Sequence, residues 1–192
     1  MKFLSINTST SLCSVSLYNS GKFITLEKEN TKDHTIYLAS YTKELLDNKY
    51  DDLNFIAVSI GPGSYAGLRT GLAFSKGLSL SINKPLVPIN NFSCMNSKVK
   101  SNNKYYICIY SHRDFIYAQL FDKNKKVSKS ECIKFNKLKE YELYGYGLEN
   151  ILNSNFNEII LNSEIVGEYA LKKHQDLIEQ DLNKINPIYL EV

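Results

Sequence analysis

Apolar and polar residues alternate through the first 27 residues, which is the pattern of half-buried strands. Three strands are expected there, at residues 3–7, 12–18 and 22–27. Asn19-Ser20-Gly21 provides the turn between the second and the third. The spacing becomes helical after residue 33, through Ile36, Leu38, Ala39, Leu45 and Leu46. This spacing predicts a helix over residues 33–48.

A nearly continuous apolar run at 54–60 predicts a strand buried on both faces. It ends in Gly61-Pro62-Gly63-Ser64, and a second helix is expected over 65–81. A strand at 85–89 and a short helix at 92–98 complete this half. The order strand-strand-strand-helix-strand-helix-strand-helix predicts an α/β fold with a mixed sheet.

Residues 100–104 are polar and lack apolar periodicity, which predicts a linker between an N-terminal half at 1–99 and a C-terminal half at 104–192. Three strands are expected after it, at 105–110, 115–122 and 127–135. The remaining elements are short: a helical turn at 149–152, a strand at 158–161, helices at 164–174 and 176–183, and an extended segment at 187–190. The second half therefore repeats the opening theme in reduced form.

The composition is that of a soluble globular protein, with 192 residues, 43% hydrophobic and 22% charged. The sequence holds neither an apolar run long enough for a membrane span nor a secretory leader, so a cytoplasmic location is expected. The cysteines lack C-x-x-C spacing, and with only three histidines no metal site is expected. We expect reduced, mostly buried thiols at Cys13, Cys94, Cys108 and Cys132.

Charge is spread unevenly along the chain. The formal net charge is +3, and arginine stands only at Arg69 and Arg113 among 23 cationic residues. Residues 93–130 carry eight basic and two acidic side chains, whereas 131–192 carry six and eleven. The basic stretch 98–129 is interpreted first as solvated loops and strand ends, with an RNA-contacting face as the alternative.

The segment from residue 60 to 79 places a glycine-rich turn between a buried strand and a helix. Such a turn gathers free backbone N–H groups at the positive end of the helix, where anions bind. It is not a Walker A loop, because Leu68 follows Gly67 where lysine is required. The candidate anion-binding residues are Thr8, Ser9, Gly61, Gly63 and Ser64. The alternative is a tight structural turn.

Along the second helix, Gly67, Gly71, Ser75 and Ser79 recur every four residues. Glycine costs about 1 kcal/mol relative to alanine inside a helix. The strip therefore predicts that another backbone packs closely here, from the same chain or from a partner. The neighbouring apolar residues favour a subunit interface.

Other catalytic patterns fail on inspection. His112-Arg113-Asp114 has the letters of a kinase catalytic loop, but the required downstream asparagine is replaced by Gln119. Ser64 lies outside any G-x-S-x-G motif. The hypothesis that the chain is a peptidase is therefore supported only by the hydroxyl of this serine. The opening strand resembles the first phosphate-binding hairpin of the actin and sugar-kinase superfamily. Asn7 stands there in place of the carboxylate, and an amide is a poor magnesium ligand.

Three segments, 3–17, 61–78 and His112-Arg113, together resemble the TsaB family. The resemblance implies an actin-like (ASKHA) α/β fold of two RNase-H-like mixed-sheet halves, the second reduced. It also implies an accessory, non-catalytic subunit needed for N6-threonylcarbamoyladenosine (t6A) at position 37 of tRNA. The chain would bind and activate a TsaD-type threonylcarbamoyltransferase. An active nucleotide-dependent phosphotransferase of the same superfamily is the alternative.

The resemblance further implies a heterodimer with TsaD, a TsaE-type ATPase in a larger complex, and a homodimer when the chain is alone. No cofactor of its own is expected, ATP or ADP would lie near the TsaD interface, and tRNA would be met only indirectly. Arg113 is expected to be structural. The expected partner interface lies on the two helices, at His34, Leu38, Leu45, Tyr65, Gly67, Leu68, Arg69, Gly71, Leu72 and Ser75.

Overall fold

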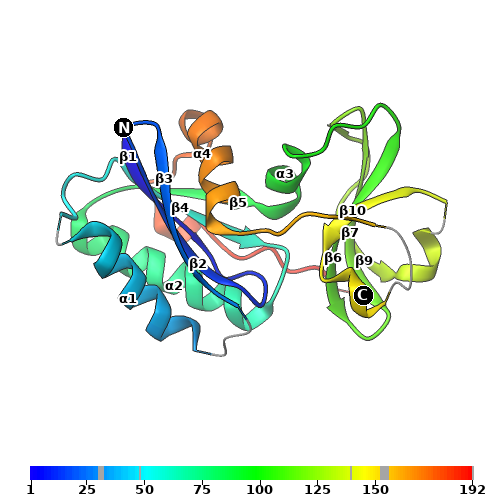
Figure 1. Cartoon of the computed structure of the whole chain (residues 1–192), viewed down its shortest axis with the longest axis horizontal. Coiled ribbons are helices and arrows are strands. Elements are labelled where there is room, and N and C mark those ends of the chain that lie inside the picture. Colours follow the sequence, from blue (N-terminus) through cyan, green and yellow to red (C-terminus); the bar gives the residue numbers. More distant parts are fainter. Residues whose placement is uncertain (30–32, 48, 139, 152–155, 192) are drawn as a thin grey trace.

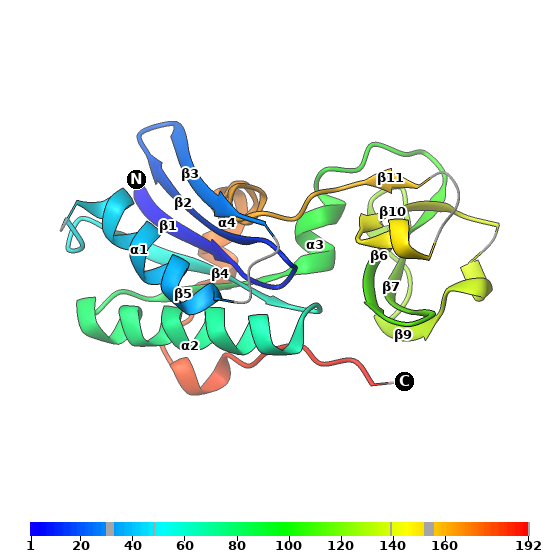
Figure 2. The same cartoon turned by 60° about the horizontal axis from the view of Figure 1, so that its bottom comes forward.

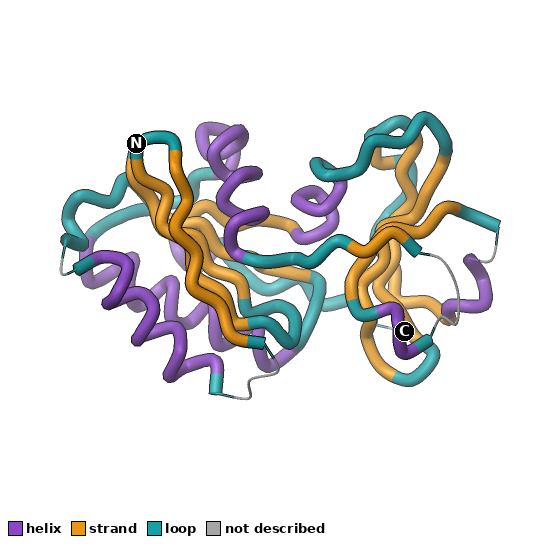
Figure 3. The backbone as a smooth tube through the Cα atoms, in the orientation of Figure 1, coloured by secondary structure: helices purple, strands orange, loops and turns teal. Residues whose placement is uncertain are grey.

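A computed structural model describes residues 1–29, 33–47, 49–138, 140–151 and 156–191. Within them the chain forms two sheets that lie next to each other (Figure 1). The long helices gather around the first sheet (Figure 3).

The first sheet has the strand order β3-β2-β1-β4-β5. β1, β2 and β3 pair antiparallel, whereas β4 and β5 run parallel to β1. Its strands are β1 (Lys2–Asn7), β2 (Cys13–Asn19), β3 (Lys22–Lys28), β4 (Phe55–Gly61) and β5 (Leu86–Asn90). This is the strand arrangement of an RNase-H-like half, and it confirms the expected mixed sheet.

Helices cover both faces of this sheet. α1 (His34–Leu46) and α2 (Tyr65–Ile82) pack side by side on one face (Figure 2), and α4 (Ser163–Leu177) packs on the other. The alternation of β1 divides its residues between these layers. Leu4 and Ile6 join the cluster under α1 and α2, whereas Phe3 joins the cluster under α4. Period-two patterning thus gives the sheet two apolar faces.

The second sheet repeats the order, as β9-β7-β6-β10-β11, with β8 beside the end of β7. β6 pairs antiparallel with β7 and parallel with β10. Its strands are β6 (Lys104–His112), β7 (Phe115–Asp122), β8 (Lys125–Lys126), β9 (Glu131–Lys134), β10 (Glu142–Tyr146) and β11 (Asn157–Glu158). In the first half, α1 connects β3 to β4 and α2 connects β4 to β5. Among the described residues, the equivalent connections of the second half, β9 to β10 and β10 to β11, contain only the 3-10 turns Phe135–Leu138 and Leu148–Asn150. The second half is therefore reduced, as expected.

The chain crosses between the two halves twice. α3 (Asn91–Asn96) leads out of the first half and contacts β6. α4 follows the second sheet yet contacts β1, β2, β4 and β5. One core cluster joins the layers, because Phe92 and Val166 pack with Tyr105 of the second sheet. The boundaries 1–99 and 104–192 stay a prediction, and the structure adds that α4 packs on the first half, whereas Tyr189, Leu190 and Glu191 run toward β9 of the second half (Figure 2).

Three sequence predictions are corrected locally. The strand expected at 127–135 is divided, because Ser128 bonds Leu120 and Gln119 and leaves the ladder before β9. β10 was missed, since its alternation is interrupted by Gly145, where a Cβ would lie 2.1 Å from the Cys108 carbonyl oxygen. The helix expected at 176–183 is absent. α4 ends at Leu177, and Glu179 then pairs with Leu86 beside β5.

Candidate functional site

The glycine-rich segment packs against the loop that follows β1. A Cβ on Gly63 would lie 2.3 Å from the Ser9 carbonyl oxygen, and one on Gly67 would lie 1.9 Å from the Thr8 carbonyl oxygen. A Cβ on Gly71 would lie 2.2 Å from Thr8 Oγ1. The strip of small residues therefore serves a close approach within the chain, which was one of its two expected explanations.

This packing bears on the expected partner interface, which stays a prediction. Side chains that are buried within the chain offer no surface to a second protein. The buried residues among those expected at the interface are Leu38, Gly67, Leu68, Gly71, Leu72 and Ser75.

Asn7, at the end of β1, is fully buried and bonded on both sides of its amide. Its Nδ2 donates to the Leu161 carbonyl oxygen at 2.8 Å, while its Oδ1 accepts from Ser9 Oγ at 2.7 Å. Asn91 Nδ2 donates to Ser9 Oγ at 2.8 Å. Thr8 Oγ1 donates to the Gly67 carbonyl oxygen at 2.7 Å. These polar groups hold α2, α3 and the start of α4 to the first sheet.

This network changes the view of the predicted anion site. The Thr8 and Ser9 hydroxyls are buried and bonded within the chain, and Ser64 Oγ accepts from the Gly67 N–H as the cap of α2. Gly61 and Gly63 form the strand-to-helix turn before it. Anion binding by these five residues stays a prediction. Asn91 was missed, because one asparagine at the start of a short helix carries no distinguishing pattern.

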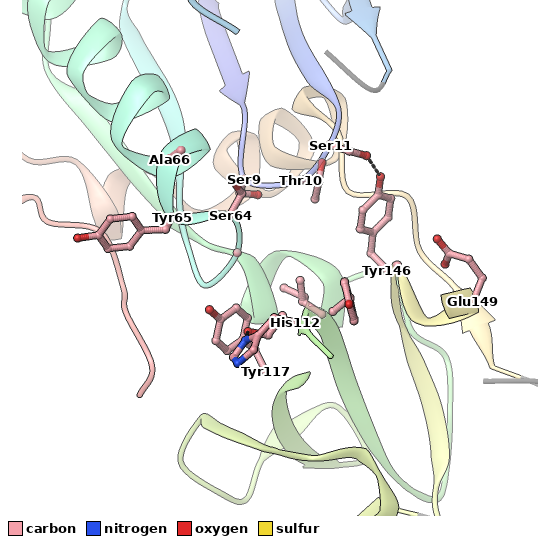
Figure 4. A pocket seen from close by; sticks show the side chains of 15 residues that line it. Ser9, Thr10, Ser11, Ser64, Tyr65, Ala66, His112, Tyr117, Tyr146 and Glu149 are labelled. Carbon is pink, nitrogen blue, oxygen red and sulfur yellow. Dashed lines mark hydrogen bonds between the residues drawn. The ribbon is translucent and has the colours of Figure 1, made fainter. Parts of the chain in front are cut away.

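A cavity of about 630 Å³ lies between the two halves and includes the turn before α2. Figure 4 shows Ser9, Thr10 and Ser64 on one wall and His112, Tyr117 and Tyr146 on the other. The Ser11 and Tyr146 hydroxyls bridge the halves at 2.8 Å. The lining holds many hydroxyls but neither lysine nor arginine. Such a cavity can hydrogen-bond a neutral polar group, but it lacks the cations that would clamp a phosphate.

The same cavity gives no support to Ser64 as a peptidase nucleophile. Ser111 Oγ lies 2.9 Å from His112 Nδ1, and within the described residues no hydrogen bond joins Ser64 to a histidine. A serine nucleophile requires a base within hydrogen-bonding reach. The cysteine thiols offer no nucleophile either. Burial raises the pKa of the Cys13 thiol to about 11, and it raises the pKa values of the other three as well. All four are free and buried, as expected.

The outer side of α2 is exposed and carries several small residues beside the longer side chains of Arg69 and Lys76. Ala66, Ala73 and Gly77 follow one another along it, and a Cβ on Gly77 would meet nothing within 4 Å. Tyr65 is 54% exposed at the start of the helix, and Leu80 is 72% exposed near its end. We call these five residues the outer α2 face. On the adjacent α1, Ile36 is exposed as well.

Arg69 joins this face to the C-terminal segment. Its Nε donates to the Tyr189 hydroxyl at 2.9 Å, and its guanidinium lies 3.8 Å from the centre of the Tyr65 ring. The two tyrosine rings are 4.8 Å apart. Ile188 N–H donates to the Ile60 carbonyl oxygen at 2.8 Å, which fixes the segment beside α2 (Figure 2). Tyr189 was missed because 120 residues separate it from Arg69.

The remaining predicted residues lie apart from this cluster. His34 is half-buried at the start of α1, where burial lowers its pKa, and Leu45 packs partly against the core below. Arg113 is exposed in the turn between β6 and β7 at a φ of 52°. In the described part of the chain it makes no hydrogen bond or ion pair, so its expected structural role has no contact to support it.

No group of three or more histidine, cysteine or acidic residues suited to a metal ion occurs among the described residues. Within the same residues, no helix is long and apolar enough to cross a bilayer.

Comparison with known proteins places this architecture. The chain matches the family model of the tRNA N6-adenosine threonylcarbamoyltransferase TsaD over residues 28–161. It is 29% identical to a tRNA threonylcarbamoyladenosine biosynthesis protein TsaB of Buchnera aphidicola subsp. Baizongia pistaciae, over 97% of this chain and 96% of that protein. The Escherichia coli protein of the same name is 30% identical over 50% of this chain and 42% of its own length.

Solved structures agree on the fold. The structure of YeaZ from Pseudomonas aeruginosa superposes with a TM-score of 0.77 at 16% identity, covering 98% of this chain and 99% of that one. Another solved structure, described as a protein with similarity to peptidase YeaZ from Pseudomonas aeruginosa, reaches a TM-score of 0.79 at 16% identity and covers 99% of both chains. The chain therefore belongs to the family of the tRNA N6-adenosine threonylcarbamoyltransferase TsaD, and within it is a relative of the proteins named TsaB.

Proposed function

We propose that this chain is an accessory subunit of tRNA threonylcarbamoyladenosine formation, which binds and activates a TsaD-type transferase without performing the transfer itself. The observation that carries the proposal is the contrast between two parts of α2. The inner side of α2 and the residues after β1 are occupied by internal packing, whereas the outer α2 face meets Tyr189 at its Tyr65 end and is open at Gly77, where no described residue lies within 4 Å of a Cβ.

The outer α2 face suits a protein partner for a physical reason. Gly77 costs the helix about 1 kcal/mol relative to alanine, and nothing in the chain requires the absence of a side chain there. Alanine and glycine on one helix face let a second helix approach closely. Tyrosine and arginine dominate the energy of many protein interfaces, and Tyr65 and Arg69 lie at one end of the face.

The partner is proposed from the relatives. Proteins named TsaB act in threonylcarbamoyladenosine biosynthesis, and the transferase model matches more than half of this chain. A heterodimer of two related folds would use the outer α2 face together with Ile36 of α1. The chain alone would pair with a second copy through the same surface. A TsaE-type ATPase would join the complex, nucleotide would bind near the interface and not to this chain alone, and the complex would work in the cytoplasm.

Reconstitution tests the proposal. The purified TsaD-type transferase, its threonylcarbamoyl-adenylate substrate and an unmodified tRNA are incubated with and without this chain. Product is expected only when the chain is added, with the rate saturating near a 1:1 ratio of the two proteins. The chain without the transferase should transfer nothing. Full transferase activity without the chain, or transfer by the chain alone, would contradict the proposal.

A further inference from the structure

The second sheet gathers basic side chains at one of its ends. Lys104 begins β6 and pairs with Asp122 at the end of β7, which in turn pairs with Lys125 of β8. The loop before β6 belongs to the same end. The exposed lysines gathered here, which we call the lysine tip, are Lys100, Lys104, Lys123, Lys125 and Lys126.

The lysine tip is held in one conformation by its backbone. Lys123 and Asn124 have φ values of 48° and 63°, and they form the two-residue turn between the paired residues Asp122 and Lys125. The Tyr105 hydroxyl donates to Asn124 Oδ1, and Asn96 Nδ2 donates to the Asn124 carbonyl oxygen at 3.0 Å. The turn is therefore attached to α3, so that little backbone entropy remains to be lost when a ligand binds it.

The charges of the lysine tip are not neutralised by its neighbours. In the part of the chain that the structure describes, none of the five ammonium groups forms an ion pair within 4.0 Å. Two carboxylates share this end of the sheet, those of Asp122 and Glu142, and Glu142 Oε2 accepts from Ser101 Oγ at 2.8 Å. Five cations against two anions leave a local excess of positive charge.

The lysine tip lies away from the surfaces already described. The opposite end of β6 and β7 carries Ser111 and His112, which line the cavity next to Tyr65. Lys104 and His112 are separated by the length of β6, roughly 26 Å at about 3.3 Å per residue. A partner on the outer α2 face would leave the tip free.

We propose that the lysine tip binds the phosphate backbone of the tRNA that the complex modifies, an inference that rests on the proposed function. The ammonium group of lysine is a compact point charge that contacts phosphate without selecting a base. The expected contact is therefore independent of sequence and weakens with salt. It would position tRNA on this chain, where the resemblance implied contact only through the partner and the charge pattern left an RNA-contacting face as the alternative.

The test measures binding of the full chain to an unmodified tRNA transcript by fluorescence anisotropy, between about 50 and 200 mM NaCl. The tip variant carries Lys104→Gln, Lys125→Gln and Lys126→Gln. The control carries Lys28→Gln, Lys137→Gln and Lys172→Gln, which removes the same charge from exposed lysines elsewhere. The tip variant should bind about tenfold more weakly at the lowest salt, and its log–log salt slope should fall by about 2. The control should change affinity less than about twofold.

Four results would overturn the inference: no salt-dependent binding of tRNA by the chain, unchanged affinity of the tip variant, equal weakening in both variants, or equally tight binding of polyglutamate. Co-purification of each variant with the transferase is measured in parallel. If the tip variant keeps its RNA affinity and still co-purifies with the transferase, only the inference about the lysine tip is rejected. If the wild-type chain does not bind the transferase, the proposed function is rejected, and the RNA measurement can still be interpreted.

Discussion

The two halves share a strand order but differ in what covers their sheets. The first sheet has α1 and α2 on one face and α4 on the other, and it separates two buried clusters. The outer face of the second sheet is covered by 3-10 turns and loops over a smaller cluster that includes Cys108, Leu143 and Leu148. A shared topology therefore does not require shared helices. The half that keeps its helices presents the outer α2 face, and the half without them presents the lysine tip.

The largest effect is expected where the first half is packed most tightly. In Gly67→Leu the Cβ would collide with the Thr8 carbonyl oxygen, so that α2 and the loop after β1 must separate. We expect a loss of at least about 3 kcal/mol of unfolding free energy, or no folded protein. Urea denaturation measures it. The control Gly77→Ala should stabilise the chain by about 0.5–1 kcal/mol, because its Cβ enters open space. Similar effects of both changes would refute the packing account.

Truncation of core leucines compares the two halves directly. Leu38, on the inner side of α1, is 0% exposed, whereas Leu143 is 7% exposed in the thinner cluster of the second half. Leu38→Ala should cost about 3–5 kcal/mol and Leu143→Ala about 2 kcal/mol, because the less enclosed site collapses more easily. The same denaturation experiment separates them. Equal costs would mean that the second half is as well packed as the first.

Asn7→Asp tests whether the end of β1 serves structure. A carboxylate cannot donate to the Leu161 carbonyl oxygen, and it would be buried beside it. We expect a loss of about 1–3 kcal/mol at pH 7. Burial would hold the pKa of the new carboxyl above its unfolded value of about 3.9, so the folded state binds the proton more tightly and part of the stability returns as the pH falls toward 4. Stability curves that stay parallel to the wild type across this range would contradict the argument.

Each buried thiol predicts a smaller effect, which appears only at high pH. Burial raises the pKa of Cys13 from the usual 9.0 to about 11, and it also raises those of Cys94 and Cys108. A group with a raised pKa stabilises the fold below its unfolded pKa, and this stability is lost as the pH rises past it. Unfolding free energy should be nearly flat from about pH 7 to 8, because the lowered pKa of His34 makes stability rise with pH only below that range. It should then fall by about 1.4 kcal/mol per thiol for each pH unit above 9. Cys13→Ala and Cys108→Ala should each reduce this decline, one in each half.

The sequence predicted the first half better than the second, for physical reasons. Long strands such as β4 and long helices such as α2 carry enough repeats for their period to be read. β10 has only five residues, and a glycine interrupts its pattern. The glycines of α2 predicted a close approach of another backbone, but they could not tell an internal neighbour from a partner. Arg69 contacts Tyr189 because the C-terminal segment packs beside α2, and local sequence patterns do not predict a contact between residues so far apart in the chain.

The central claim is that the outer α2 face binds the transferase. Gly77→Arg adds a large side chain where nothing in the chain lies within 4 Å, so the fold should remain intact. Gln175→Arg on the exposed side of α4 is the control. Calorimetric titration of the transferase into each folded variant should show affinity reduced at least about 100-fold for Gly77→Arg and unchanged for Gln175→Arg, since a blocked close approach removes the core of an interface. Wild-type affinity in Gly77→Arg would contradict the account.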